Sequence, residues 1–141
     1  MKKILITADI SEMAEKVILK GVELAKELNA EYSVISVTDD TIMVPDTATF
    51  VMPQVIESQK EQASSTIRGI LERNGLKPAN VFFEIGDTVD KIIEKAGEYK
   101  ADILVVGTHG RTGLDHLLLG SMAEKLIRTS PISIFVAKFK E

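Results

Sequence analysis

The chain has no cysteine among its 141 residues. This absence excludes disulfide bonds, thiolate nucleophiles and cysteine-ligated metal sites, although it does not decide the redox compartment. A surplus of basic residues is also missing, since 17 Lys and Arg stand against 21 Asp and Glu for a formal net charge of −4. A mildly acidic chain binds polyanions poorly, so we expect neither a nucleic-acid partner nor binding to anionic membranes.

Long apolar runs are absent as well. The sequence contains nothing near the ~18 consecutive apolar residues of a membrane span. Residues 1–6 begin like a signal peptide, but Asp9 and Glu12 cut the apolar run well below the ~7–15 residues of an h-region. We therefore expect a cytoplasmic protein. With 45% hydrophobic and 27% charged residues, residues 1–141 are expected to form a single soluble domain.

Short apolar runs alternate with segments of helical periodicity. The apolar runs predict strands at residues 4–6, 32–37, 81–85, 103–106 and 132–137, and those at 4–6 and 103–106 are apolar enough to be central. The periodic segments predict helices at about 12–28, 51–73, 89–96 and 122–129. The apolar stripes of the first two helices include Leu28 and Val55. Ser11 is expected to cap the first helix, and Asn29 and Asn74-Gly75 to end the first and second.

This alternation predicts an α/β fold, Rossmann-like, with one five-stranded parallel sheet and helices on both of its faces. Placing the two most apolar strands side by side in the middle gives the strand order 3-2-1-4-5. In that order the winding reverses between the first and fourth strands, where a crevice opens at their carboxyl ends. Asp9 and Gly107 follow those two ends. Residues 38–50, which have no clear period, are expected to form a long loop that is a lid or simply mobile.

A glycine-rich loop carries the clearest chemical signal. Gly107, Gly110 and Gly120-Ser121 form the pattern Gly-x2-Gly-x9-Gly-Ser between a predicted strand and a predicted helix. Glycines after a parallel strand let the backbone approach a ligand and expose its N–H groups. The helix that follows favours an anion at its N-terminus, and His109 and Arg111 add further donors. The loop suits a polyphosphate, although it is neither a Walker A loop nor a Gly-x-Gly-x-x-Gly fingerprint.

These residues resemble the universal stress protein family, specifically its ATP-binding branch. The resemblance covers essentially the whole chain, and it rests on Ile4-Leu5-Ile6 with Asp9-x-Ser11, Gly86-Asp87, residues 101–113, Leu118-Leu119-Gly120-Ser121 and Ser130-Pro131. The chain departs from the family pattern at Ile10, where glycine or phenylalanine is common. It departs again at Ser133, which replaces the second proline of the usual pair. Neither departure touches the phosphate loop.

The resemblance implies an adenine nucleotide alpha hydrolase-like fold and a site for ATP or another adenine nucleotide. It implies that Asp9 contacts the ribose or adenine, that Thr7 and Ala8 line the base and that Val37 packs on the adenine. It implies that Val106 and Gly107 hold the base and ribose edge through their backbone. It implies, finally, that His109, Gly110 and Arg111 lie along the phosphates, which Gly120, Ser121 and Met122 cradle.

The resemblance also implies a regulatory or protective role in the stress response and a homodimer that pairs through residues 132–137. Such an edge strand is apolar enough for pairing across a two-fold axis. The expected function is binding rather than catalysis. A slow ATPase or phosphohydrolase, with His109 as the candidate for proton transfer, is one alternative. A nucleotide-free dimeric interaction module and a receiver-like domain with Asp9 and Lys138 are the others.

Several of these residues also have simpler interpretations. Ser121-x-x-Glu124 has the spacing of a capping box, with the glutamate turned back toward the backbone, and this role is compatible with phosphate binding. Asp9 could simply end a strand. His109 and His116 are the only histidines, and they lack partners at metal-site spacing. No metal site built by the protein is expected, and Mg²⁺ or Mn²⁺ bridging the phosphates is the more plausible metal.

Overall fold

The computed structural model describes residues 2–8, 13–38, 53–108 and 119–138. Along the chain, the elements are β1 (Lys3–Thr7), α1 (Ala14–Leu28), β2 (Glu31–Thr38), α2 (Pro53–Arg73), β3 (Val81–Ile85), α3 (Thr88–Tyr99), β4 (Ile103–Gly107), α4 (Ser121–Thr129) and β5 (Ser133–Ala137). Each strand and helix predicted from the sequence is present, with small shifts at the ends. Most of the predicted loop at 38–50 lies outside the described residues.

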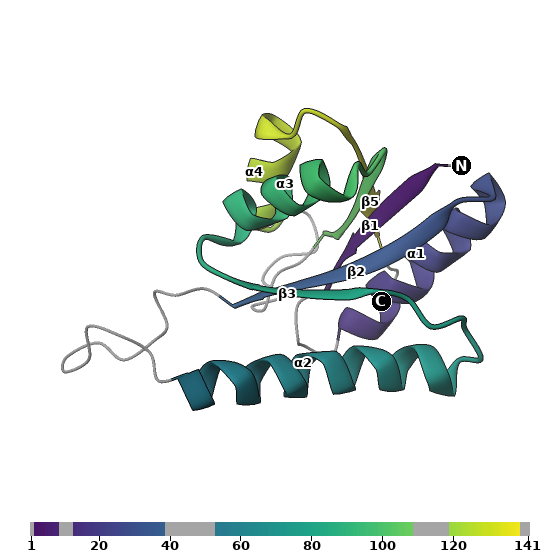
Figure 1. The fold of residues 1–141 in the computed structure, drawn as a ribbon. Helices are drawn as coiled ribbons and strands as arrows, with labels where there is room; N and C mark the ends of the chain where they lie inside the picture. Colours follow the sequence, from purple (N-terminus) through teal and green to yellow (C-terminus); the bar gives the residue numbers. More distant parts are fainter. Residues whose placement is uncertain (1, 9–12, 39–52, 109–118, 139–141) are drawn as a thin grey trace.

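The strands form one five-stranded sheet in the order β3-β2-β1-β4-β5. All four pairings are parallel, so the predicted topology is confirmed. Helices α1 and α2 cover one face of the sheet, and α3 and α4 cover the other (Figure 1). Because β1 lies between two neighbours and two helical layers, Ile4, Leu5 and Ile6 are completely buried.

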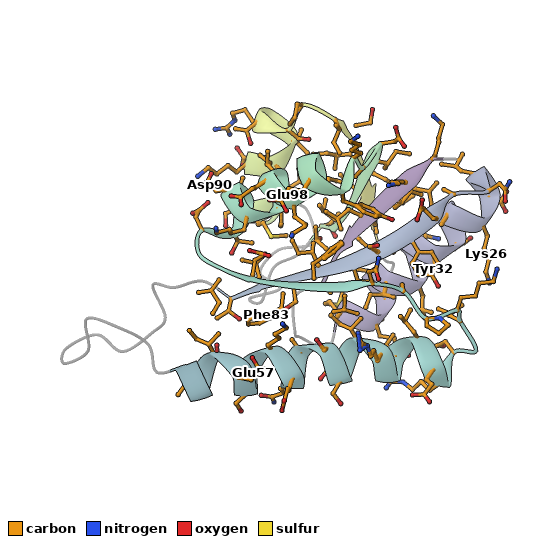
Figure 2. All side chains as sticks on the ribbon, viewed as in Figure 1. Lys26, Tyr32, Glu57, Phe83, Asp90 and Glu98 are labelled. Atoms are coloured by element: carbon orange, nitrogen blue, oxygen red, sulfur yellow. The ribbon has the colours of Figure 1, made fainter. Side chains whose placement is uncertain are left out.

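Alternation along β1 divides the apolar side chains between two cores. Ile4 and Ile6 pack with the residues of α1 and α2, whereas Leu5 packs with those of α3 and α4. Helix α1 approaches the sheet closely at Gly21, where an added Cβ would lie 2.6 Å from the Ile6 side chain. At the edge of the sheet, Phe83 of β3 lies on the side of α2 (Figure 2).

The ends of the first two helices confirm two predictions. Asn29 follows α1 in the left-handed conformation, with φ 52° and ψ 47°, and Gly75 follows α2 with φ 66°. Both stops were predicted. At the start of α1, Met13 precedes the first helical residue, Ala14. Ser11, the predicted cap, lies outside the described residues.

Two residues that were predicted on buried stripes are exposed. Leu28 is 41% exposed and Val55 is 46% exposed. Leu28 is the last residue of α1, and Val55 lies in the first turn of α2, whose buried residues all belong to its later turns (Ala63, Ile67, Ile70 and Leu71). Periodicity therefore predicted the correct face of each helix but not where the sheet stops covering it. Among the described residues, no helix is long and apolar enough to cross a bilayer.

Candidate functional site

The sheet separates between β1 and β4 at its carboxyl edge. The β1–β4 ladder ends at the pair Ile6↔Val105. Its two flanking ladders continue further, β1–β2 to Thr7↔Ile35 and β4–β5 to Gly107↔Ala137. Strands β1 and β4 are therefore each held on their outer side after they have stopped pairing with each other. We call this place the fork, defined by Thr7 and Ala8 on one side and Val106 and Gly107 on the other.

Main-chain groups of both strands point into the fork. Successive residues of a strand direct their N–H and C=O groups to opposite sides. The Ala8 N–H donates to the Ile35 carbonyl on β2, so the backbone groups of Thr7 face β4. The Thr108 N–H donates to the Ala137 carbonyl on β5, so the backbone groups of Gly107 face β1. The Thr7 carbonyl and the Gly107 N–H thus face each other one rung beyond the end of the ladder.

A side chain links the two strands where the fork begins. The Thr7 hydroxyl donates to the Val105 carbonyl at 3.0 Å in a buried hydrogen bond. Next to it, Val106 is fully buried, so its side chain belongs to the core, and by alternation its backbone groups face β5, with which it pairs. Of the two residues expected to act through the main chain, Gly107 is the one whose backbone groups face the fork.

The remaining apolar residues expected around the base lie on two sides of the sheet. Val37, near the end of β2, and Met122, in the first turn of α4, are half-buried and pack against the core under α3 and α4. Ala8 is buried in the other core, under α1. The structure therefore places Val37 and Met122 on one face, while Ala8 reaches the fork from the β1 side.

The two ends of the glycine loop meet at the carboxyl end of β4. The Gly120 N–H donates to the Thr108 carbonyl at 2.7 Å, and the Thr108 N–H donates to Ala137 at 3.2 Å. Thr108 follows the last residue of β4, and Gly120 precedes the first residue of α4. These two bonds hold the N-terminus of α4 beside the fork. No pattern in the sequence marks Thr108, because its role depends on backbone bonds to residues far along the chain.

The N-terminus of α4 is capped by glycine rather than by serine. Gly120 is the N-cap residue, with extended backbone angles and no side-chain capping bond, and Ser121 is the first residue of the helix. The predicted capping box is therefore wrong. Glu124 does not turn back toward the cap but forms an ion pair with Arg128 one turn along α4. The Ser121 hydroxyl is not used for capping, and the glutamate is drawn along the helix, away from its N-terminus.

The other expected ligand contacts cannot be placed. Asp9, His109, Gly110 and Arg111 lie outside the described residues. Of the expected site residues that are described, Thr7, Ala8, Val106 and Gly107 meet at the fork, and Gly120, Ser121 and Met122 begin α4 beside it. Across residues 2–8, 13–38, 53–108 and 119–138, no group of three or more His, Asp or Glu side chains is arranged to hold a metal ion.

Comparison with known proteins gives the context for this geometry. Residues 1–138 match the universal stress protein family. The universal stress protein MJ0531 of Methanocaldococcus jannaschii is 31% identical over 140 residues, which cover 97% of this chain and 82% of that protein.

Solved structures agree with the sequence comparison. The hypothetical protein MJ0577 superposes with a TM-score of 0.76 at 29% identity, covering 99% of this chain and 97% of its own. A universal stress protein in complex with cAMP superposes with a TM-score of 0.71 at 19% identity, covering 97% of this chain and 96% of its own. The five-stranded parallel architecture is thus shared with solved members of the family. The chain belongs to the universal stress protein family.

Proposed function

We propose that the fork and the N-terminus of α4 together bind an adenine nucleotide, ATP in the first place. The observation that carries this proposal is the 2.7 Å hydrogen bond from the Gly120 N–H to the Thr108 carbonyl. This bond places the N-terminus of α4, which has no side-chain cap, next to the fork. There the Thr7 carbonyl and the Gly107 N–H lie beyond the end of the β1–β4 ladder. A helix N-terminus favours phosphate, and the carboxyl edge at a reversal of winding favours a nucleotide.

The site divides into two ends. Thr7, Ala8, Asp9 and Val37 would surround the base and ribose, with the backbone of Val106 and Gly107 opposite. The loop residues His109, Gly110 and Arg111 would follow the phosphates toward α4. There Ser121 and Met122 would receive them with their backbone N–H groups and the Ser121 hydroxyl, while Gly120, whose N–H is bonded to Thr108, would let the phosphates approach the backbone closely. Mg²⁺ or Mn²⁺ would be bound by the phosphates themselves, since the described residues offer no ready-made cluster of metal ligands.

A solved protein of the same fold supports the choice of an adenine nucleotide. The universal stress protein solved in complex with cAMP contains an adenine nucleotide on this architecture. The glycine-rich pattern of the present chain, followed by a helix N-terminus, suits a polyphosphate. ATP is therefore the first ligand to test, with ADP and cAMP beside it.

The role we propose is binding that regulates or protects in a stress response in the cytoplasm, with no catalytic residues assigned. A homodimer would form through residues 132–137. Strand β5 is an edge of the sheet, and Ile134 and Val136 on it, like Ile132 just before it, are only half-buried. Ile127 of the neighbouring helix α4 is 46% exposed, which extends the apolar surface beside that edge.

The binding proposal is tested on the purified protein. Acid denaturation should release an adenine nucleotide that chromatography identifies, and calorimetry should then measure ATP binding to the emptied protein with Mg²⁺. ATP at one hundred times Kd should raise the free energy of unfolding by ~2.7 kcal/mol. Gly120→Val should abolish this gain, because a branched side chain would occupy the phosphate position.

Gly97→Val is the matched control for that variant. Gly97 lies in α3, and a Cβ added there has no atom within 4 Å outside its own neighbourhood. Its ATP affinity should equal that of the wild type. ATP binding to Gly120→Val at wild-type strength would contradict the assignment of the phosphate end. A wild-type protein that neither carries a nucleotide nor binds one would contradict the function as a whole.

A further inference from the structure

Thr7 is a polar residue in a place where an apolar one would pack equally well. It is 5% exposed, and its predecessors Ile4, Leu5 and Ile6 on β1 are all 0% exposed. Valine has nearly the same shape, favours strands as threonine does and carries no hydroxyl that must be satisfied on burial. Packing alone therefore does not account for a hydroxyl at this position.

The partner of that hydroxyl is on the other side of the fork. Thr7 Oγ1 lies 3.0 Å from the Val105 carbonyl oxygen, and the two residues are 98 positions apart in the sequence. Val105 is also the last residue of β4 that pairs with β1. A carbonyl oxygen has two lone pairs, so the hydroxyl can add a bond at this last rung without displacing a main-chain bond. A side chain thus ties the two strands together at the point where they separate.

We propose that Thr7 is a positioning residue that sets where the fork begins. By holding Val105, its hydroxyl stops the separation of β1 and β4 from moving back toward Ile6. It thereby fixes the spacing between the Thr7 carbonyl and the Gly107 N–H. This inference rests on the nucleotide site proposed above, because those two groups face the base and ribose end. Fixing them before the ligand arrives lowers the cost of ordering on binding.

The effect should be confined to one end of the site. The phosphate end depends on Gly120 and on the Thr108 backbone, which is anchored to Ala137 on β5. Neither of these contacts passes through Thr7. Loss of the Thr7 hydroxyl should therefore weaken binding of the base and ribose and leave binding of the phosphates unchanged. If Thr7 only stabilised the fold, its loss would not weaken binding at one end of the site and spare the other.

The test compares Thr7→Val, which keeps the shape and loses the hydroxyl, with Thr7→Ser, which keeps the hydroxyl. Calorimetry would measure Kd for ATP, for adenosine and for inorganic triphosphate, each with Mg²⁺ and well below the melting temperature. For Thr7→Val we expect Kd to rise about tenfold for ATP and adenosine, the loss of roughly one buried hydrogen bond, and to stay unchanged for triphosphate. Thr7→Ser should remain within about twofold of the wild type for all three.

Thr129→Val is the matched control, because it also deletes a bond from a threonine hydroxyl to a carbonyl. Thr129 Oγ1 donates to the Lys125 carbonyl at 2.7 Å at the far end of α4. Its loss should leave all three affinities unchanged. If Thr7→Val does not fold, Thr7→Ala compared with Thr7→Ser tests the same hydroxyl.

Three results would overturn the inference while the proposed function stands. They are an unchanged ATP affinity in Thr7→Val, an equal loss for adenosine and triphosphate, and a Thr7→Ser variant that is as weak as Thr7→Val. A wild-type protein that binds neither ATP nor adenosine would remove the proposed function, and this inference with it. The wild-type titration therefore separates the two kinds of failure.

Discussion

Arg73 holds Glu15 with two hydrogen bonds, from Nη2 to Oε1 at 2.6 Å and from Nε to Oε2 at 3.3 Å. The contact joins the last residue of α2 to the first turn of α1. Asn74 adds a third bond, from its Nδ2 to Glu15 Oε2 at 2.9 Å. Two helices that cover the same face of the sheet are thus connected at a single carboxylate. A bidentate arginine–carboxylate contact of this kind fixes the relative orientation of the two side chains as well as pairing their charges.

This contact predicts a dependence of stability on pH. The hydrogen bond from Arg73, followed by that from Asn74, lowers the pKa of Glu15 in the folded protein. A lowered folded pKa stabilises the fold above the ordinary glutamate value of about 4.3, and this contribution is lost as the pH falls below that value toward the folded pKa. In Glu15→Gln the free energy of unfolding should therefore fall less steeply below that pH than in the wild type. Urea unfolding at a series of pH values measures this.

Glu57→Gln supplies the comparison for the Glu15 variant. Glu57 is an exposed carboxylate on α2 (Figure 2). Its replacement should leave the acid limb of the stability curve as it is in the wild type. If the curves of Glu15→Gln and wild type have the same slope below the glutamate pKa, the contact does not contribute in solution.

Gly86 is required by its backbone conformation. Its φ is 146°, a value that residues with a side chain rarely adopt, and its N–H donates to the Thr38 carbonyl at 3.0 Å. An added Cβ would also lie 2.8 Å from Lys91 Cε, but that side chain is flexible and can move away. Gly86→Ala should therefore lower the free energy of unfolding by about 1–3 kcal/mol through backbone strain. Chemical denaturation measures the loss.

Gly97→Ala is the opposite case on the helix that follows Gly86. Gly97 has open space around an added Cβ and lies within α3. Alanine there should raise stability by about 0.5–1 kcal/mol, because glycine is a poor helix former. A Gly86→Ala variant as stable as Gly97→Ala would show that the turn before α3 relaxes at little cost.

A variant of Ser121 distinguishes two possible roles of its hydroxyl, capping α4 and binding a ligand. Gly120 occupies the N-cap position, so the Ser121 hydroxyl is not needed to cap α4. Ser121→Ala should therefore change the free energy of unfolding by less than about 0.5 kcal/mol. If the hydroxyl binds phosphate, the same variant should weaken ATP binding by about 1.5 kcal/mol, or roughly tenfold. Reduced stability with unchanged affinity would reverse this assignment.

The proposed dimer can be tested through one N–H group of β5. Ala137 directs its backbone groups toward β4, so by alternation those of Ile134 point outward from the edge of the sheet. Ile134→Pro removes this outward N–H, and proline is tolerated on edge strands when the lost donor faces away from the sheet. Light scattering should show a monomer for Ile134→Pro. Ile134→Ala, which keeps the N–H, should remain dimeric like the wild type, and a dimeric proline variant would contradict pairing through this edge.

The order of the elements was determined by the sequence alone. Apolar runs such as Ile4-Leu5-Ile6 separated by amphipathic segments left few topologies, and the order with β1 in the centre is the one observed. Stop signals were equally readable, because Asn29 and Gly75 adopt backbone angles that few other residues tolerate. Local conformation and the pattern of apolar residues depend on a residue and its near neighbours, so a single sequence carries them.

Tertiary structure decided the contacts that make the site specific. The sequence placed Ser121 as a cap, but α4 is capped by Gly120. The end of the β1–β4 ladder and the bond from Thr7 to Val105 left no local signal at all. These features depend on strand register and on residues about one hundred positions apart, which periodicity does not encode. They are settled only when two helical layers pack against the sheet and fix how far each pair of strands stays together.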